Sequence, residues 1–180
     1  RGLSGEKPDY VVELKIDGDS AALTYKKCLF IQGATRGDGL KGEDVTHNLK
    51  TIPDIPLKLK KTSSEQFPEL LDIRGEVYME IKDFEALNEE KKKRGEVLFA
   101  NPRNAAGGSV KLLDSRITAK RRLKYFVHSL GLIEGIKFKT HFEFLKWAQR
   151  CGFSVNPHLR LCKNLPQVVE TCEEYAQKRN

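Results

Sequence analysis

The stretch on which the expected fold depends reads Val11-Val12-Glu13-Leu14-Lys15-Ile16-Asp17-Gly18. Apolar residues at positions 12, 14 and 16 alternate with charged residues at positions 13, 15 and 17, which is the period of a β-strand with one face on a core. Residues 20–25 and 28–35 predict two more strands with short links, and short links favour antiparallel pairing. We therefore expect an antiparallel sheet whose polar face displays Lys15 between two carboxylates.

After residue 35 the sequence predicts both strands and helices. A further apolar strand is expected at 70–78, another at 124–133 and a short one near Val155, whereas residues 57–69 read as a charged surface connection and 98–104 as irregular. Apolar residues at helical spacing predict helices at 43–49, 82–94, 105–113, 141–150 and 165–178. The expected fold class is α+β, with antiparallel sheets and flanking helices.

Composition limits the class of protein. The 180 residues are 39% apolar and 32% charged, which suits one globular core. No run of about 18 apolar residues occurs, so we expect no membrane span, and residues 1–8 lack the apolar centre of a secretory signal. The 32 Lys and Arg exceed the 25 Asp and Glu by 7, which favours polyanionic partners. We expect a cytoplasmic monomer.

Neither the cysteines nor the histidines form a recognisable site. The four cysteines show no C-x-x-C pair and no spacing to histidine of the zinc type, so we expect reduced thiols and no zinc. The four histidines are scattered, and none has a neighbouring Ser or Cys that would indicate a triad. We interpret each histidine as structural or surface-exposed, and we expect no dedicated metal-binding cluster.

Lys15 is the candidate for covalent chemistry. A surface ion pair with Glu13 or Asp17 is the simpler interpretation of this cluster. A lysine attacks only as the neutral amine, so a nucleophilic role requires desolvation or added cations nearby. The candidate cations, which could also hold phosphates, are Arg36, Arg74, Arg103 and Lys111.

A glycine-rich segment follows the predicted strands. Residues 37–42 read Gly-Asp-Gly-Leu-Lys-Gly, which fits the G-x-G-x-x-G pattern of dinucleotide-binding folds. That fold needs parallel strands, whereas the strands here are joined by short antiparallel links, and Pro53 stops the helix that follows. We therefore do not expect a Rossmann site.

The motifs resemble those of one family. Lys15-Ile16-Asp17-Gly18 is similar to the K-x-D-G nucleophile motif of covalent nucleotidyltransferases, which include DNA ligases, RNA ligases and capping enzymes. Four further segments, in their order and spacing, resemble the bacterial-type NAD-dependent DNA ligases, and the likeness is clearest from Val11 to Gly131. These segments are Ala34–Gly39 with Gly42–Asp44, Arg74–Val77, Phe99–Ala106 and Asp114–Lys120.

The resemblance implies the nucleotidyltransferase (ATP-grasp-like) core of a DNA ligase and a mechanism. Lys15 would attack the adenylyl phosphorus of NAD and release nicotinamide mononucleotide (NMN), and AMP would pass to the 5′-phosphate of nicked double-stranded DNA before the nick is sealed. Magnesium is implied as a cofactor, and a nucleoid location if the source is bacterial. The implied contacts are Glu13 with adenine, Arg36 and Glu76 with the ribose, Asp17 with the lysine or metal region, and Arg103 and Lys111 with nucleotide or DNA phosphates.

The sequence also departs from the family. Lys111 stands where the family usually has arginine, so it keeps the charge and loses the bidentate fork. The motif D-G-V-V-I-K and a later lysine-bearing strand are not in residues 1–180, nor are the upstream NMN-binding subdomain and the downstream oligonucleotide-binding (OB), zinc, helix-hairpin-helix and BRCT regions. We therefore expect a partial adenylation domain over 1–180 that does not ligate alone.

Two other functions remain open at this point. The chain could be a noncatalytic nucleic-acid-binding module on a nucleotidyltransferase scaffold, or an ATP-dependent RNA ligase or capping-type enzyme that shares only K-x-D-G. The basic runs 91–94 and 120–124 either meet DNA phosphates or form solvated surface.

Overall fold

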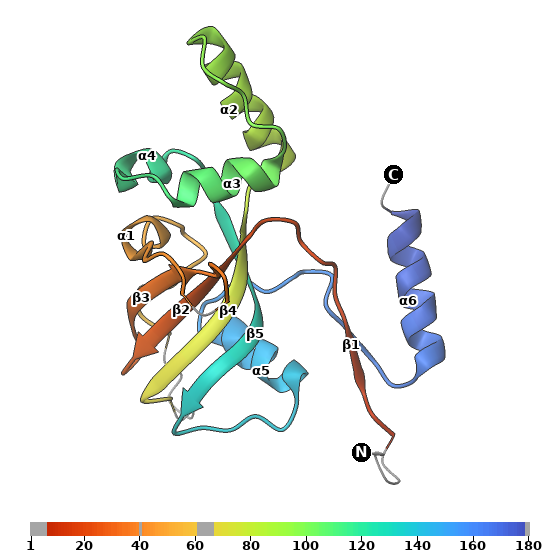
Figure 1. Ribbon diagram of the computed structural model, residues 1–180. Helices are drawn as coiled ribbons and strands as arrows, with labels where there is room; N and C mark the ends of the chain where they lie inside the picture. The colour runs from red at the N-terminus through yellow and green to blue at the C-terminus, as the bar shows by residue number, and fades with distance from the viewer. Residues whose placement is uncertain (1–6, 40, 61–66, 179–180) are drawn as a thin grey trace.

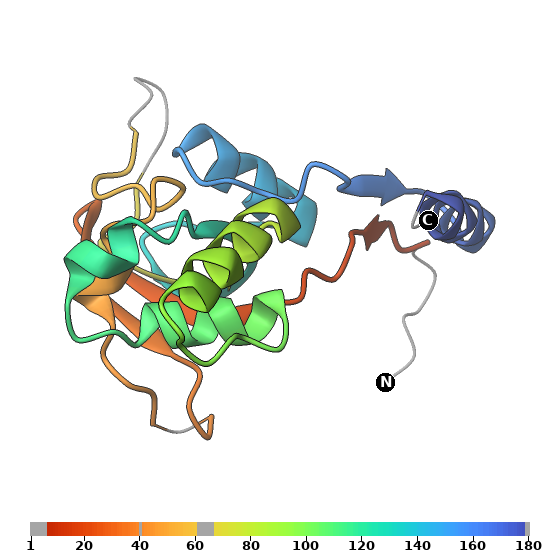
Figure 2. The same ribbon diagram turned by 90° about the horizontal axis from the view of Figure 1, so that it is seen from above.

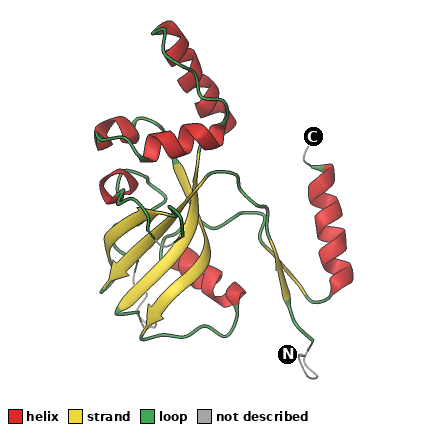
Figure 3. Ribbon diagram, in the orientation of Figure 1, coloured by secondary structure: helices red, strands yellow, loops and turns green. Residues whose placement is uncertain are grey.

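The computed structural model describes residues 7–39, 41–60 and 67–178 (Figure 1). Strands and helices are mixed along the chain, so the predicted α+β class is confirmed (Figure 3). The strands are β1 Tyr10–Val12, β2 Asp19–Lys26, β3 Leu29–Thr35, β4 Leu70–Tyr78, β5 Lys124–Glu134 and β6 Arg160–Cys162. The helices are α1 Thr46–Leu49, α2 Ile81–Lys93, α3 Pro102–Val110, α4 Ser115–Ala119, α5 His141–Arg150 and α6 Leu165–Gln177.

The main sheet has four antiparallel strands in the order β3-β2-β4-β5. Side chains of β2, of β4 and of the first four residues of β5 alternate between a buried set on one face and less buried residues on the other, as the period of two requires. Helix α5 passes behind this sheet in Figure 1, and its Phe144 and Leu145 belong to the buried core. The front face, as far as the chain is described, is open and carries the polar residues of β4.

Three helices lie beyond one end of the sheet. Helix α3 contacts β2 and β4, and α2 and α4 pack on α3 (Figure 1). The Asn101 side chain caps α3 by accepting a hydrogen bond of 2.8 Å from the Asn104 backbone N–H, and Pro102 occupies the first turn. Asn48, a buried residue of α1, donates to the backbone carbonyls of Val110 and Leu112. These contacts fix α3 above the sheet.

Strands β1 and β6 form a separate two-stranded antiparallel sheet that carries α6. Seen from above, this unit lies to one side of the main sheet (Figure 2). Exposed ion pairs reinforce it, at 2.6 Å between Lys163 and Asp9 and 2.7 Å between Arg160 and Glu174. No helix in the described ranges has the length and apolar character needed to span a membrane.

The prediction of a strand through Val11–Gly18 was wrong. Strand β1 ends at Val12, because its partner β6 has only three residues and lies outside the main sheet. Residues 13–18 continue without regular secondary structure, and Leu14, expected on a core face, is 37% exposed. Alternation alone indicated an extended segment and could not identify its partner.

The other expected elements agree more closely. Strand β4 and helix α5 have the predicted bounds, and β2, β3, β5, α1, α2 and α6 lie within a few residues of theirs. Helix α3 starts at Pro102 rather than residue 105, because Asn101 caps it and Pro102 suits a first turn. Helix α4 was missed, and the late strand is at 160–162, while Val155 makes only a single bridge to Val127. Residue 40 of the glycine-rich segment and residues 61–66 of the predicted connection lie outside the described residues.

Gly75 on β4 is predicted to be indispensable to the core. A Cβ at this position would lie 2.2 Å from Cζ of Tyr125 and 2.3 Å from the Phe126 carbonyl oxygen. Gly75→Ala should therefore lower the free energy of unfolding in urea by about 1–3 kcal/mol. Gly107→Ala, in helix α3 where the nearest atom is the Asp19 carboxylate at 3.2 Å, is the control and should cost less. Equal stability of the two variants would contradict this view of the core.

Candidate functional site

Lys15 lies on an irregular segment that arches over one end of the main sheet between β1 and β2 (Figure 1). Gly18 ends this segment, and its backbone N–H donates to Glu76 Oε1 at 3.2 Å. A Cβ on Gly18 would lie 2.1 Å from the Val77 carbonyl oxygen, so the close approach of the segment to β4 requires glycine there. The Lys15 segment is thereby held beside the carboxylate of β4.

Asn156 holds the same segment from its other side. Its Nδ2 donates to the Leu14 carbonyl at 2.7 Å, and its Oδ1 accepts from the His158 N–H at 2.9 Å. The residue is only 5% exposed, so both groups depend on these partners. The sequence analysis missed Asn156, and its place in Asn156-Pro157 carried no local indication of a site.

A cavity of about 300 Å³ opens beside Lys15, and its walls come from four separate parts of the chain. This volume lies at the lower end of the usual range for small-ligand pockets. Phe126 of β5 stacks on Tyr78 of β4, with ring centroids 4.8 Å apart and planes 23° apart, so its ring is fixed. The lining residues are Glu13, Leu14, Lys15, Ile16, Glu76, Phe126, Val127, His128 and Asn156.

The two carboxylates in this cavity are partly desolvated. Burial raises the pKa of Glu13, and burial likewise raises the pKa of Glu76 although the Gly18 N–H and the charges of Lys15 and Arg103 oppose the shift. Carboxylates kept from water retain acceptor capacity for a ligand's hydroxyl or amino groups. The cavity therefore offers polar acceptors in a largely apolar wall.

His128 is the second residue that the sequence analysis left without a role here. It lies on β5 with Nε2 at 3.9 Å from Glu76 Oε2 and Nδ1 at 3.0 Å from Ser129 Oγ. Burial lowers the pKa of His128, and the charges of His141, Arg74 and Lys15 act in the same direction. The imidazole is thus kept neutral at the wall of the cavity.

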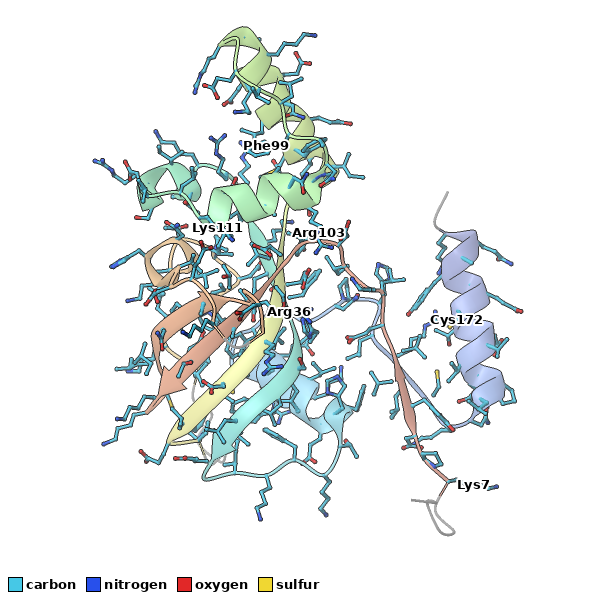
Figure 4. All side chains as sticks on the ribbon, in the orientation of Figure 1. Lys7, Arg36, Phe99, Arg103, Lys111 and Cys172 are labelled. Atoms are coloured by element: carbon cyan, nitrogen blue, oxygen red, sulfur yellow. The ribbon has the colours of Figure 1, made fainter. Side chains whose placement is uncertain are left out.

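Arg103 reaches the Lys15 segment from helix α3. Its Nη1 lies 3.0 Å from Asp17 Oδ1, and both side chains are exposed, so this pair contributes little to stability (Figure 4). The cap at Asn101 places Arg103 in the first turn of α3, directed toward the segment. Of the predicted residues, the structure brings together Glu13, Lys15, Asp17, Glu76 and Arg103.

Lys111 and Arg36 stand apart from that group. Lys111 follows the far end of α3 and pairs with Glu43 at 2.6 Å, which raises the pKa of Lys111 (Figure 4). Arg36 directly follows β3, and its backbone N–H donates to the Ser20 carbonyl at 3.1 Å. Its side chain lines a second cavity, on the open face of the main sheet.

Metal-binding side chains do not converge at this site. The described residues contain no group of three or more His, Cys, Asp or Glu side chains able to hold an ion. Asp17, the expected neighbour of a metal, instead pairs with Arg103. The described residues therefore do not form a magnesium cage of their own.

Asn156→Ala should slow formation of any covalent adduct at Lys15, because the Leu14 carbonyl loses its donor and the segment loses one of its fixed points. The buried partners left unpaired should also cost about 1–3 kcal/mol of stability. Asn88→Ala is the matched control, because Asn88 likewise bridges a distant backbone, accepting from and donating to Phe99 at 2.9 Å each. Intact mass against time measures the adduct, and equal slowing in both variants would refute a positioning role for Asn156.

Comparisons with known proteins identify the family of this chain. The family model of the NAD-dependent DNA ligase adenylation domain matches residues 3–180. The chain is 48% identical to a DNA ligase of Bacillus cytotoxicus, 52% to one of Thermoanaerobacter sp. (strain X514) and 49% to one of Acetivibrio thermocellus. These matches cover 99%, 96% and 99% of this chain and 26%, 25% and 26% of the relatives, so the chain spans about a quarter of their length. The chain therefore belongs to the NAD-dependent DNA ligase adenylation domain family.

Proposed function

We propose that this chain is the part of a DNA ligase that takes AMP from NAD, with Lys15 as the nucleophile. The observation that carries the proposal is the position of Lys15 at a cavity of about 300 Å³ whose other polar residues are Glu13, Glu76, His128 and Asn156. The front of the main sheet, the Lys15 segment and α3 then form part of a nucleotidyltransferase core. The family match indicates NAD as the donor of the AMP.

The covalent step is a substitution at phosphorus. The Lys15 amine loses its proton to solvent or a neighbouring base, and its lone pair forms an N–P bond to the adenylyl phosphorus. The bond from that phosphorus to the bridging oxygen breaks, and NMN leaves with the electron pair. The product is a phosphoramidate, lysyl-AMP, with no change of oxidation state. The close approach of Gly18 to β4, with its hydrogen bond to Glu76, would keep the lysine beside the cavity during this step.

The remaining residues of the Lys15 cavity, together with Arg36 of the adjoining second cavity, would bind and orient the adenosine. We assign Glu13 to the adenine and Glu76 with Arg36 to the ribose, since a carboxylate accepts hydrogen bonds from hydroxyl groups. The fixed ring of Phe126 gives the base an apolar wall. Burial of Glu76 strengthens each hydrogen bond that it accepts.

The later steps require DNA. AMP would pass from Lys15 to the 5′-phosphate at a nick, and attack by the 3′-hydroxyl would release AMP and seal the strand. Arg103 and Lys111, at the two ends of α3, are the proposed phosphate contacts, and each must exchange a carboxylate partner for phosphate. The net charge of +7 favours this polyanionic partner.

Several wider assignments belong to the same proposal. Residues 1–180 would be part of the adenylation domain of a cytoplasmic, monomeric enzyme, associated with the nucleoid in a bacterium, and this part alone would not ligate. Magnesium would neutralise phosphate charge when bound, as phosphoryl transfer generally requires.

Intact mass spectrometry after incubation with NAD and magnesium tests the nucleophile. The longest available form of the protein that carries this chain should gain the mass of one adenylyl group. Lys15→Ala should gain none, whereas Lys137→Ala, at an exposed position away from the cavity, should behave as the parent. An adduct formed only from ATP would move the protein to the ATP-dependent class. No adduct from either donor would leave a noncatalytic nucleic-acid-binding module.

Glu76→Gln should show that Glu76 serves NAD binding and does not stabilise the fold at pH 7. The folded pKa of Glu76 lies above its usual 4.5, so the stability linked to its proton is fully present below pH 4.5 and is lost as the pH rises through the folded value. The Gln variant should therefore be at least as stable as the parent at pH 7.

The same variant should change how NAD binding depends on pH. In the parent, the KM for NAD should rise as the pH falls toward the raised pKa of Glu76, because protonation removes acceptor capacity. In Glu76→Gln, the KM should be higher at pH 7 and should not follow this titration. Thermal unfolding and KM profiles for the two proteins provide the check, and identical profiles would argue against ribose binding by Glu76.

A further inference from the structure

A second cavity, of about 480 Å³, lies on the open front face of the main sheet. It adjoins the Lys15 cavity, because His128 lines both. The residues that define it are Ser20 and Ala22 of β2, Thr35 and Arg36 at the end of β3, Arg74 of β4 and His128 of β5. Its size lies within the usual range for ligand pockets.

The strand register explains how this second cavity, which we name the Arg36–Arg74 basin, is formed. Ser20 pairs with Glu76, and Ala22 pairs with Arg74, so these four side chains share the front face in two adjacent rows. The Arg36 N–H extends the first row by donating to the Ser20 carbonyl. Because the side chains of Ser20 and Ala22 are small, they leave space above the sheet between the two arginines.

The two arginines have no counter-charge in the part of the chain that the structure describes. Neither guanidinium forms an ion pair or a side-chain hydrogen bond among those residues, and both side chains are exposed. The acid next along the face, Glu76, is already committed to the Gly18 N–H and lies near His128. The charge of Arg74 reaches the shared wall, where it helps to hold His128 neutral.

We propose that the Arg36–Arg74 basin is a phosphate subsite that extends the nucleotide cavity beyond Glu76, with Arg74 as the phosphate contact and Arg36 between this phosphate and the ribose assigned to it above. Guanidinium groups bind phosphate oxygens through paired N–H donors, and two of them facing one cavity match a tetrahedral oxyanion better than a carboxylate pair would. The bound phosphate would belong to one of two ligands, and both ligands rest on the proposed function. They are a phosphodiester of DNA and the second phosphate of the dinucleotide.

Binding measurements on the longest available form of the protein, in the Lys15→Ala background, distinguish the two sources without any covalent chemistry. Arg74→Ala is the test, Arg74→Lys keeps the charge without the fork, and Lys26→Ala removes one exposed charge from another part of the same sheet. The probes are a nicked DNA duplex, titrated at several salt concentrations, and NAD, titrated by calorimetry. Thermal unfolding verifies that each variant is folded.

Each source predicts its own result. If DNA fills the basin, Arg74→Ala should bind DNA about tenfold more weakly, and the slope of log K against log salt should fall by about one, with NAD affinity unchanged. If the dinucleotide fills it, NAD should bind about tenfold more weakly with the DNA slope unchanged. Arg74→Lys should recover the salt slope while regaining only part of the affinity.

The opposite results separate the two proposals. Arg74→Ala values equal to those of Lys26→Ala for both probes would overturn the phosphate subsite alone. Failure of the Lys15→Ala parent to bind either NAD or DNA would instead overturn the proposed function on which the two sources depend.

Discussion

The close approach of Gly18 to strand β4 is the constraint on which the site depends. A Cβ at position 18 would collide with the Val77 carbonyl oxygen. Because glycine has no Cβ, the chain can pass near enough to β4 for the Gly18 N–H to reach the Glu76 carboxylate. This contact fixes one end of the Lys15 segment, and Asn156 holds its middle through the Leu14 carbonyl. A segment without a strand ladder is thus positioned by two hydrogen bonds and one exposed ion pair to Arg103.

Opposing electrostatic effects determine the pKa of Glu76. Burial disfavours the charged form of Glu76, while the Gly18 N–H and the charges of Lys15 and Arg103 favour it, and the net effect is a raised pKa. Lys15 therefore lies beside a carboxylate that water screens poorly, with a neutral His128 at the same wall. A ligand with hydroxyl groups near Glu76 and negative charge near Lys15 and Arg103 would complement this arrangement.

Local pattern predicted the elements but not the site's walls. Strand β4 and helix α5 matched their predicted bounds, because alternation defines the first and the second begins at a Thr140 cap that accepts from the Glu143 N–H. The Lys15 segment reads as a strand by alternation, and only its remote partners show otherwise. Asn156 lies 142 residues from Leu14 in sequence, and no local pattern links the two. The motif likeness indicated Lys15 and Glu76, whereas the cavity needed tertiary structure.

The register of β4 ties the site to the core. Because strand side chains alternate, Arg74 and Glu76 face the front only while Ile73, Gly75 and Val77 face the core. Gly75 leaves the space into which the Tyr125 ring packs, so the core itself selects this register. A shift by one residue would bury both charges and expose the apolar set, which folding strongly disfavours. The spacing of charges along this strand is therefore set by packing on the opposite face, and the binding chemistry uses positions that the core leaves free.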